Sequence, residues 1–171
     1  MENQNQPNKS SIIIRKARPE DVKRISTLKR QTLEKININD YPRPAIDFLK
    51  KEYSQRFILE KLKTRKVFVL VNSFKILGCI DINIRTGRVG GLYIDYKHLH
   101  KGYGLKLMQF IENFARAKNI KKISLHPTKT AYPFYKKLGY EVIKRDIWKG
   151  PGFKTKSIDM EKRLTRRSEI K

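Results

Sequence analysis

Residues 98–107, His-Leu-His-Lys-Gly-Tyr-Gly-Leu-Lys-Leu, carry the clearest chemical pattern in the chain. Gly102 and Gly104 follow a predicted strand and precede an amphipathic helix. Glycines at such a junction let the backbone fold closely around a ligand, and the helix N-terminus adds N–H groups and partial positive charge. Lys101 and Lys106 add full positive charges. The pattern therefore predicts a phosphate cradle, a device that usually holds a cofactor.

The segments around this cradle alternate between strand-like and helix-like patterns. Apolar and β-branched runs predict strands at 12–14, 67–71, 76–84, 89–94, 123–126, 140–147 and 154–160. Apolar residues spaced by three and four predict helices at 17–33, at 45–63, from the glycines to 118, and at 131–138. We therefore predict a mixed α/β (α+β) fold, in which a central, mostly antiparallel sheet of six to seven strands is flanked by about four helices.

Two features of the strands make this prediction specific. The uninterrupted run Val-Phe-Val-Leu-Val at 67–71 is typical of a central strand that is buried on both faces. Gly78 lies inside the next strand, where a glycine indicates a bulge or a close approach of another chain segment.

Length and cysteine content restrict the class of protein. A chain of 171 residues suits one domain, which we place at 12–164 between polar tails at 1–11 and 165–171 that we expect to fray. Cys79 is the only cysteine, so an intramolecular disulfide and a multi-cysteine zinc site are excluded, and no metal is expected. No apolar run approaches the ~18 residues of a membrane span, and the N-terminus has no apolar signal core. We expect a cytoplasmic protein.

The formal net charge of +24 has two explanations. One is a polyanionic partner such as nucleic acid. The other is compositional drift, which the spread of lysines over nearly every predicted element favours. Nucleic acid is therefore a permitted but not a favoured partner. In either case the charge would attract an anionic cofactor.

Two motifs about thirty residues apart have a recognisable order. Residues 99–104 read Leu-His-Lys-Gly-Tyr-Gly, and residues 131–140 read Ala-Tyr-Pro-Phe-Tyr-Lys-Lys-Leu-Gly-Tyr. The first resembles the acetyl-CoA motif of the GNAT superfamily of N-acetyltransferases, and the second resembles the final signature of that family. Segments 92–95, 39–41 and 65–69 also fit, so the resemblance covers about residues 13–163.

The resemblance implies transfer of an acetyl group from acetyl-CoA, acting as co-substrate, to a primary amine of a small molecule or a protein. Direct attack of the neutral amine on the thioester is expected. The strand that ends at Ile94 would splay from its neighbour and bond the pantetheine arm. The implied cofactor-binding residues are Leu92, Tyr93, Ile94, Leu99, His100, Lys101, Gly102, Tyr103, Gly104, Leu105, Thr128 and Tyr135.

Two of these residues have alternative roles. The resemblance makes Tyr135 the general acid that protonates the departing thiolate, since a phenol is neutral near pH 7 and donates a hydrogen bond. Its aromatic neighbours also allow a packing role. Thr128 would lie near the cofactor, or cap a helix, and one hydroxyl can do both.

The sequence departs from the family pattern at several positions. Leu99 replaces the usual Gln or Arg, His100 a common glycine, and Tyr96 a common proline. A cradle built of backbone N–H groups tolerates such changes. They also keep open a non-catalytic module on the same scaffold, which would sense acyl-CoA or bind nucleic acid.

The general base is left open by the sequence. Arg88 and Gly91 occupy the positions where relatives often carry Glu. Asp81 is an alternative, although a surface or turn-facing carboxylate is the simpler interpretation.

His98, His100 and His126 lie near the motifs and titrate in the useful range, but each also suits a structural or solvated role. Ordered water is a further candidate, and Cys79 fits a small core residue better than a nucleophile.

The acceptor side carries little recognisable chemistry. Tyr41 and Trp148 lie in the segments 37–60 and 144–156 that would flank the acceptor, either shaping its pocket or anchoring loops. The lysines and arginines of these segments favour an acceptor with its own carboxylate or phosphate over a polyamine. A homodimer rests on the resemblance alone.

Overall fold

A computed structural model describes residues 11–73 and 75–164, and most of the predicted tails lies outside them. The strands are β1 (Ile12–Lys16), β2 (Lys66–Asn72), β3 (Lys75–Asn83), β4 (Arg88–Ile94), β5 (Lys122–Leu125), β6 (Glu141–Gly150) and β7 (Phe153–Arg163). The helices are α1 (Val22–Lys35), α2 (Arg43–Glu52), α3 (Gln55–Thr64), α4 (Tyr103–Ala117) and α5 (Tyr132–Lys137), with short 3-10 turns η1 (Pro19–Asp21) and η2 (Tyr96–His98). None of the helices in the described ranges is long and apolar enough to span a bilayer.

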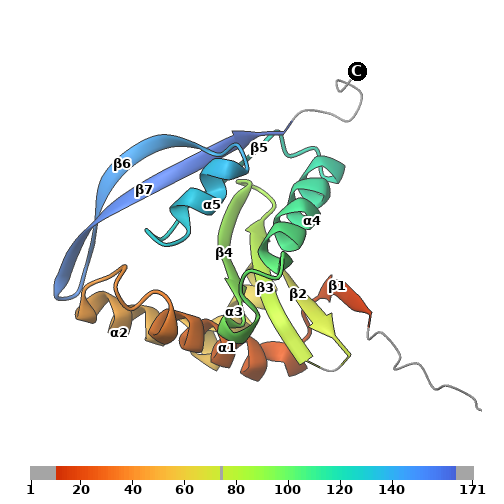
Figure 1. Ribbon diagram of the computed structural model, residues 1–171, viewed down its shortest axis with the longest axis horizontal. Coiled ribbons are helices and arrows are strands. Elements are labelled where there is room, and N and C mark those ends of the chain that lie inside the picture. The colour runs from red at the N-terminus through yellow and green to blue at the C-terminus, as the bar shows by residue number, and fades with distance from the viewer. Residues whose placement is uncertain (1–10, 74, 165–171) are drawn as a thin grey trace, which may run out of the picture.

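The strands of the described chain form one open sheet in the order β1-β2-β3-β4-β5-β7-β6 (Figure 1). Neighbouring strands are antiparallel except β4 and β5, which are parallel because α4 carries the chain across between them. The mixed, mostly antiparallel α/β fold expected from the sequence is thus confirmed.

The sheet opens at its centre. β4 and β5 are paired only where Arg88 lies opposite Ser124. Beyond this pair the two strands separate, and no other strand of the described chain fills the gap. Part of the backbone of β4 is therefore left without a strand partner on its β5 side.

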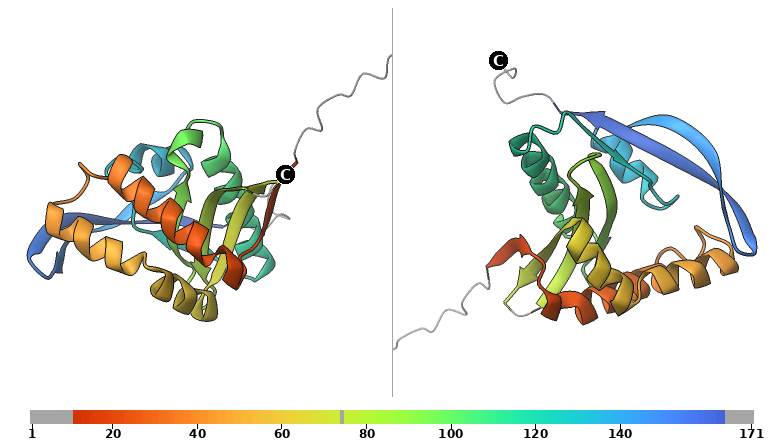
Figure 2. Two further views of the ribbon diagram at one scale, coloured as in Figure 1. Left: turned by 90° about the horizontal axis from the view of Figure 1, so that it is seen from below. Right: turned by 180° about the vertical axis from the view of Figure 1, so that it is seen from behind.

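Helices cover the two faces of the β2–β4 region, as the views in Figures 1 and 2 show. Leu70 of β2 packs in the cluster that contains Leu107 and Ile111 of α4, whereas Val69 packs in the cluster that contains Ile25 of α1. Ile58 of α3 joins this second cluster. Alternate residues of β2 thus face opposite layers, which confirms that this strand is buried on both faces.

The prediction of one helix over 45–63 is wrong. Helix α2 ends at Glu52, and the carbonyl of its C-cap residue, Tyr53, accepts a 2.6 Å hydrogen bond from the Ser26 hydroxyl of α1. Ser54 has extended backbone angles and starts α3 as its N-cap residue. The break lets α3 pack over β2 while α2 continues away from the sheet, so a tertiary contact outweighs the continuous helical periodicity.

The hairpin of β6 and β7 extends past the rest of the sheet to reach α2 (Figure 2). Phe48 of α2 contacts Trp148 of β6 and Phe153 of β7, with ring centroids 6.0 and 5.9 Å apart. The turn between the strands is confined to Pro151 and Gly152, because β6 continues to Gly150. This aromatic bridge connects two segments that lie far apart in the sequence.

Candidate functional site

A cavity of about 1060 Å³ occupies the gap between β4 and β5. Its walls come from β4, the segment after β5, the start of α4, α5, the α1–α2 connection and the β6–β7 hairpin. The volume is at the upper end of the range for a pocket that holds one small ligand. There is room for two substrates to meet.

The glycine stretch forms the entrance to α4 at one end of this cavity. Gly102 is the N-cap residue in the left-handed region, with φ of 77°, and it has no side chain that could cap the helix. The N–H groups of the first turn, at Tyr103, Gly104 and Leu105, are those that an α-helix leaves without backbone partners. His100 also has a positive φ, of 60°. The loop thus presents unpaired donors and the positive end of a helix, as an anion site requires.

Most of the predicted cofactor-binding residues line this cavity. They are Leu92, Tyr93, Ile94, Leu99, His100, Gly102, Tyr103, Gly104, Leu105, Thr128 and Tyr135. Lys101 is not among the lining residues, and its side chain is exposed. The Leu99 side chain is half-buried and packs against the main core.

A bulge in β4 shapes the wall opposite the helix. Gly91 pairs with Asp81 and Val89 with Ile82, which leaves Gly90 as the extra residue. A Cβ at Gly90 would lie 2.2 Å from Asp81 Oδ1, so no other residue fits without displacing that carboxylate.

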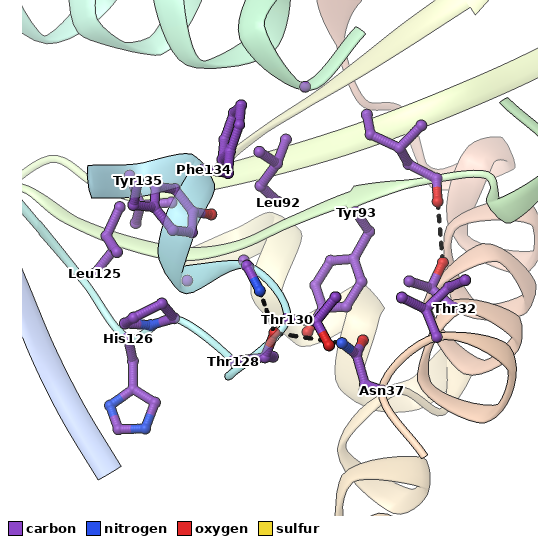
Figure 3. Close-up of a pocket in the computed structure, with 18 of the residues that line it drawn as sticks. Thr32, Asn37, Leu92, Tyr93, Leu125, His126, Thr128, Thr130, Phe134 and Tyr135 are labelled. Atoms are coloured by element: carbon purple, nitrogen blue, oxygen red, sulfur yellow. Dashed lines mark hydrogen bonds between the residues drawn. The ribbon is translucent and has the colours of Figure 1, made fainter. Parts of the chain in front are cut away.

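Two residues of β4 have contacts that sequence reasoning did not find. The Tyr93 hydroxyl forms a short hydrogen bond with the hydroxyl of Tyr53, and burial, the largest cause, raises the pKa of Tyr93 well above its usual value. The Ile94 carbonyl accepts a hydrogen bond of 3.1 Å from the Thr32 hydroxyl (Figure 3). That carbonyl is therefore already engaged, and so is the Tyr93 hydroxyl, although Tyr93 lines the cavity.

Tyr135 is 6% exposed and borders the cavity, and Figure 3 shows its hydroxyl directed into it. Its ring contacts Phe134 and Tyr140 at centroid distances of 5.1 and 5.8 Å. Burial raises the pKa of the phenol, which keeps the proton on its oxygen at neutral pH. Tyr135 thus packs with its aromatic neighbours and still offers a proton to the cavity.

The Thr128 hydroxyl belongs to a polar clamp between two loops. It accepts hydrogen bonds from Ala131 N–H at 3.1 Å, just before α5, and from Asn37 Nδ2 at 3.3 Å. Asp40 accepts from Asn37 Nδ2 and from both N–H and hydroxyl of Thr130. The clamp fixes the α1–α2 connection against the loop that carries the Tyr135 helix, as Figure 3 shows for Asn37 and Thr128.

Two residues that the sequence offered for catalysis, Asp81 and Cys79, do not line the cavity. Asp81 is 2% exposed and is ion-paired with Lys29, at 3.7 Å, and with Arg65. It is neither a surface carboxylate nor a lining residue of the cavity. Cys79 is also buried away from the cavity, and burial raises the pKa of its thiol to about 11. Neither residue is placed to react with a substrate.

The three histidines all line the cavity, at two different places. His98 and His100 belong to the turn and loop that lead into the glycine cradle. His126 directly follows β5, and its Nδ1 lies 3.3 Å from Asp159 Oδ1. Figure 3 shows the ring of His126 on the side of β7, away from Tyr135.

Part of the cavity wall is aromatic, and the wall as a whole carries little positive charge. Tyr41 and Trp148 both line it and contact each other at a centroid distance of 5.8 Å. Its charged lining residues are Asp146, Asp159 and Arg88, and Arg88 is paired with Asp159 at 2.9 Å. No lysine is among the described lining residues, although lysines and arginines number 40 in the chain. The expected basic acceptor side is therefore not formed around the cavity.

Sequence reasoning missed several residues that shape the site. The segments 39–41 and 65–69 carried a signal for Asp40 and Arg65, as part of the family resemblance. Lys29 gave no signal, because a lysine on an amphipathic helix normally faces solvent. Among the described residues, no three His, Cys, Asp or Glu side chains come together as a metal site requires.

Comparison with known proteins agrees with this arrangement. Residues 31–164 match the family described as acetyltransferase (GNAT) domain. No curated protein sequence matches the chain. One solved structure with a similar fold is a GCN5-related N-acetyltransferase from Rhodopseudomonas palustris, with TM-score 0.82, 17% identity, and coverage of 94% of this chain and 100% of that chain.

Two other similar structures contain coenzyme A. PaiA N-acetyltransferase from Thermoplasma acidophilum has TM-score 0.74 and 21% identity, over 90% of this chain and 99% of that chain. An aminoglycoside 6'-N-acetyltransferase has TM-score 0.68 and 17% identity, over 91% and 98%. These likenesses show the fold, while the family match covers well over half of the sequence. The chain belongs to the GNAT family of acetyltransferases.

Proposed function

We propose that this protein transfers an acetyl group from acetyl-CoA to a primary amine of a small molecule or a protein, by direct attack of the amine on the thioester. One observation carries the proposal. An uncapped helix start, an opened strand edge and a buried tyrosine hydroxyl all face the same cavity. These are the groups needed to hold a pyrophosphate, to position a thioester and to protonate a thiolate.

The cradle fits the anionic end of acetyl-CoA. The N–H groups of Tyr103, Gly104 and Leu105 would donate to the pyrophosphate oxygens, and the α4 dipole would favour their charge. A Cβ at Gly102 would meet nothing within 4 Å, and one at Gly104 would make only an ordinary contact with Phe134 at 3.5 Å, so the surface at Gly102 is open to a ligand. Lys101 and Lys106 would contribute through their field, since neither side chain lines the cavity.

The opened edge of β4 fits the pantetheine arm. Beyond Arg88 the β5-facing backbone groups of β4 have no strand partner. The amides of the arm would take the place of the missing strand, and backbone N–H groups near Leu92 would polarise the thioester carbonyl.

Tyr135 would act as general acid. Its hydroxyl is protonated at neutral pH and is directed into the cavity, so it can transfer a proton to the sulfur as the carbon–sulfur bond breaks. A covalent acetyl-cysteine route receives no support, because Cys79 is buried outside the cavity. The room in the cavity for a second substrate supports direct transfer.

The charge of +24 favours a second candidate, a module on this scaffold that senses acyl-CoA or binds nucleic acid without catalysis. The retained Tyr135 hydroxyl and the small positive charge of the cavity lining weigh against it. A thermal-shift experiment with CoA, acetyl-CoA and duplex DNA separates the two. We expect stabilisation by micromolar acetyl-CoA, and no salt-sensitive effect of DNA. Salt-sensitive DNA binding without any effect of CoA would refute the enzyme.

A further inference from the structure

We infer that His126 is the group that accepts the proton of the attacking amine, and that Asp159 is the residue that positions it. The inference rests on the proposed function and adds the proton acceptor that the sequence left open. His126 and Asp159 contact each other in the wall of the cavity.

The geometry of the pair is that of an oriented imidazole. His126 Nδ1 lies 3.3 Å from Asp159 Oδ1, and the same oxygen accepts a 2.9 Å hydrogen bond from Arg88 Nη2. The three residues come from the end of β5, from β7 and from the start of β4, so they meet where the sheet divides. The His126 side chain is 33% exposed and borders the cavity, which makes it accessible to a substrate.

The charge of Asp159 fixes which nitrogen is free. Burial raises the pKa of this carboxyl, but the hydrogen bonds from Arg88 and His126 outweigh burial and give a net lowering. An ionised carboxylate at Nδ1 favours the tautomer with the proton on Nδ1. The lone pair of Nε2 is then available for a proton. The charged groups among the described lining residues are Arg88, Asp146 and Asp159, and the Tyr135 phenol borders the same cavity on the side away from the His126 ring.

Other candidate groups lack this combination. His98 Nδ1 lies 3.4 Å from Asp95 Oδ2, but the nitrogen is buried without a hydrogen bond and sits in the turn before the cradle. Tyr93 and Tyr53 are phenols whose pKa values are raised, chiefly by burial, so they hold their protons at neutral pH. Among the described residues, His126 is the histidine whose ring is hydrogen-bonded to a carboxylate at the acceptor side.

The ammonium form of the acceptor first loses one proton to solvent. The amine nitrogen then bonds to the thioester carbon, its second proton passes to His126 Nε2, the carbon–sulfur bond breaks, and Tyr135 protonates the sulfur. His126 releases its proton and Tyr135 regains one through solvent. The products are an N-acetyl amine and free CoA, without any oxidant or reductant.

The test compares H126Q and D159N with D47N, a matched control that removes an exposed carboxylate on α2. We expect H126Q to lower kcat about 100-fold or more, the usual contribution of a general base, with acetyl-CoA affinity by calorimetry within about twofold of wild type. In a plot of the log of kcat/KM for the amine against pH, the wild type should approach a slope of two at low pH, because both the amine and the imidazole must lose a proton. The slope for H126Q should be one, because only the amine then has to lose a proton. Imidazole in the buffer should restore turnover to H126A. D159N should lower kcat with little change in KM for acetyl-CoA, and D47N should match the wild type.

Wild-type kcat and an unchanged proton dependence in H126Q would overturn the inference and leave the proposed function intact. A wild-type protein that binds acetyl-CoA but acetylates no amine would refute both the role of His126 and the proposed function. A loss of kcat in H126A that imidazole does not restore, with a normal melting temperature, would assign His126 a structural role instead.

Discussion

Arg88 of β4 lies opposite Ser124 of β5, and this pair marks the point at which the two parallel strands part. The cavity begins beyond it, between a bulged β4 and the loop that carries Thr128 to α5. The single pair therefore divides the sheet into a continuous part and an opened part. It also places Arg88 within reach of Asp159, next to the imidazole of His126.

The first prediction concerns the general acid. Tyr135→Phe removes the hydroxyl and keeps the buried ring, so we expect kcat to fall roughly 100-fold, within the usual range for a general acid. Acetyl-CoA affinity should change less than about twofold, because the cradle is untouched. Steady-state kinetics and calorimetry check both values. Tyr132→Phe, on the same helix but outside the cavity lining, is the control. A Tyr135→Phe variant with unchanged turnover would remove the acid role.

The second prediction separates cofactor binding from stability at the cradle. Gly104→Asp places a carboxylate in the first turn of α4, where it interacts favourably with the helix dipole by about 0.3–1 kcal/mol. The same charge would repel a pyrophosphate, so acetyl-CoA affinity should fall at least tenfold while the melting temperature is maintained or rises. Gly104→Ala should bind nearly as the wild type, since the added methyl has only ordinary contacts. Undiminished binding by Gly104→Asp would place the pyrophosphate elsewhere.

The third prediction tests the buried charges behind the β4 bulge. Asp81→Asn leaves Lys29 buried with no carboxylate, which should lower the free energy of unfolding by about 3–5 kcal/mol. Denaturant unfolding measures the loss. Combining it with Lys29→Met should recover part of the stability, because the unpaired charge is then gone. A stable Asp81→Asn protein without activity would return Asp81 to the list of bases.

The fourth prediction concerns the charge of the acceptor. Among the described residues, the cavity lining contains Asp146, Asp159 and one arginine, Arg88, which is paired with Asp159. Basic residues elsewhere on the surface act on a substrate in the cavity only through solvent, which screens their charge. A four-carbon diamine should therefore be acetylated with a severalfold higher kcat/KM than the amino acid of equal length that ends in a carboxylate. Asp146→Asn should reduce this preference. The opposite order would restore the preference for anionic acceptors that the composition suggests.

Local patterns in the sequence predicted much of this architecture. The glycine pair and the segment 131–140 depend on nearby residues, and each lies on the element expected for it. The bulge or close approach predicted at Gly78 is also found. A register shift falls beside it, and a Cβ there would lie 2.7 Å from Ile94 Cδ1. The uninterrupted apolar run at 67–71 likewise predicted a β2 buried on both faces.

What the sequence could not predict depends on contacts between distant segments. The break at Tyr53 reflects a hydrogen bond from Ser26, and the burial of Lys29 reflects a carboxylate 52 positions along the chain. The charge of the cavity wall could not be read from composition, because the basic residues of 37–60 and 144–156 are not among the described residues that line the cavity. His126 stood out only when the fold brought Asp159 to it.

The most direct test of the account is product analysis by mass spectrometry. The purified full chain is incubated with acetyl-CoA and a panel of primary amines, and acetylated amine and free CoA are quantified together. We expect equal amounts of acetylated amine and free CoA with at least one amine, and no acetylated protein intermediate. Acetyl-CoA that binds in the cavity but acetylates none of the amines would contradict it.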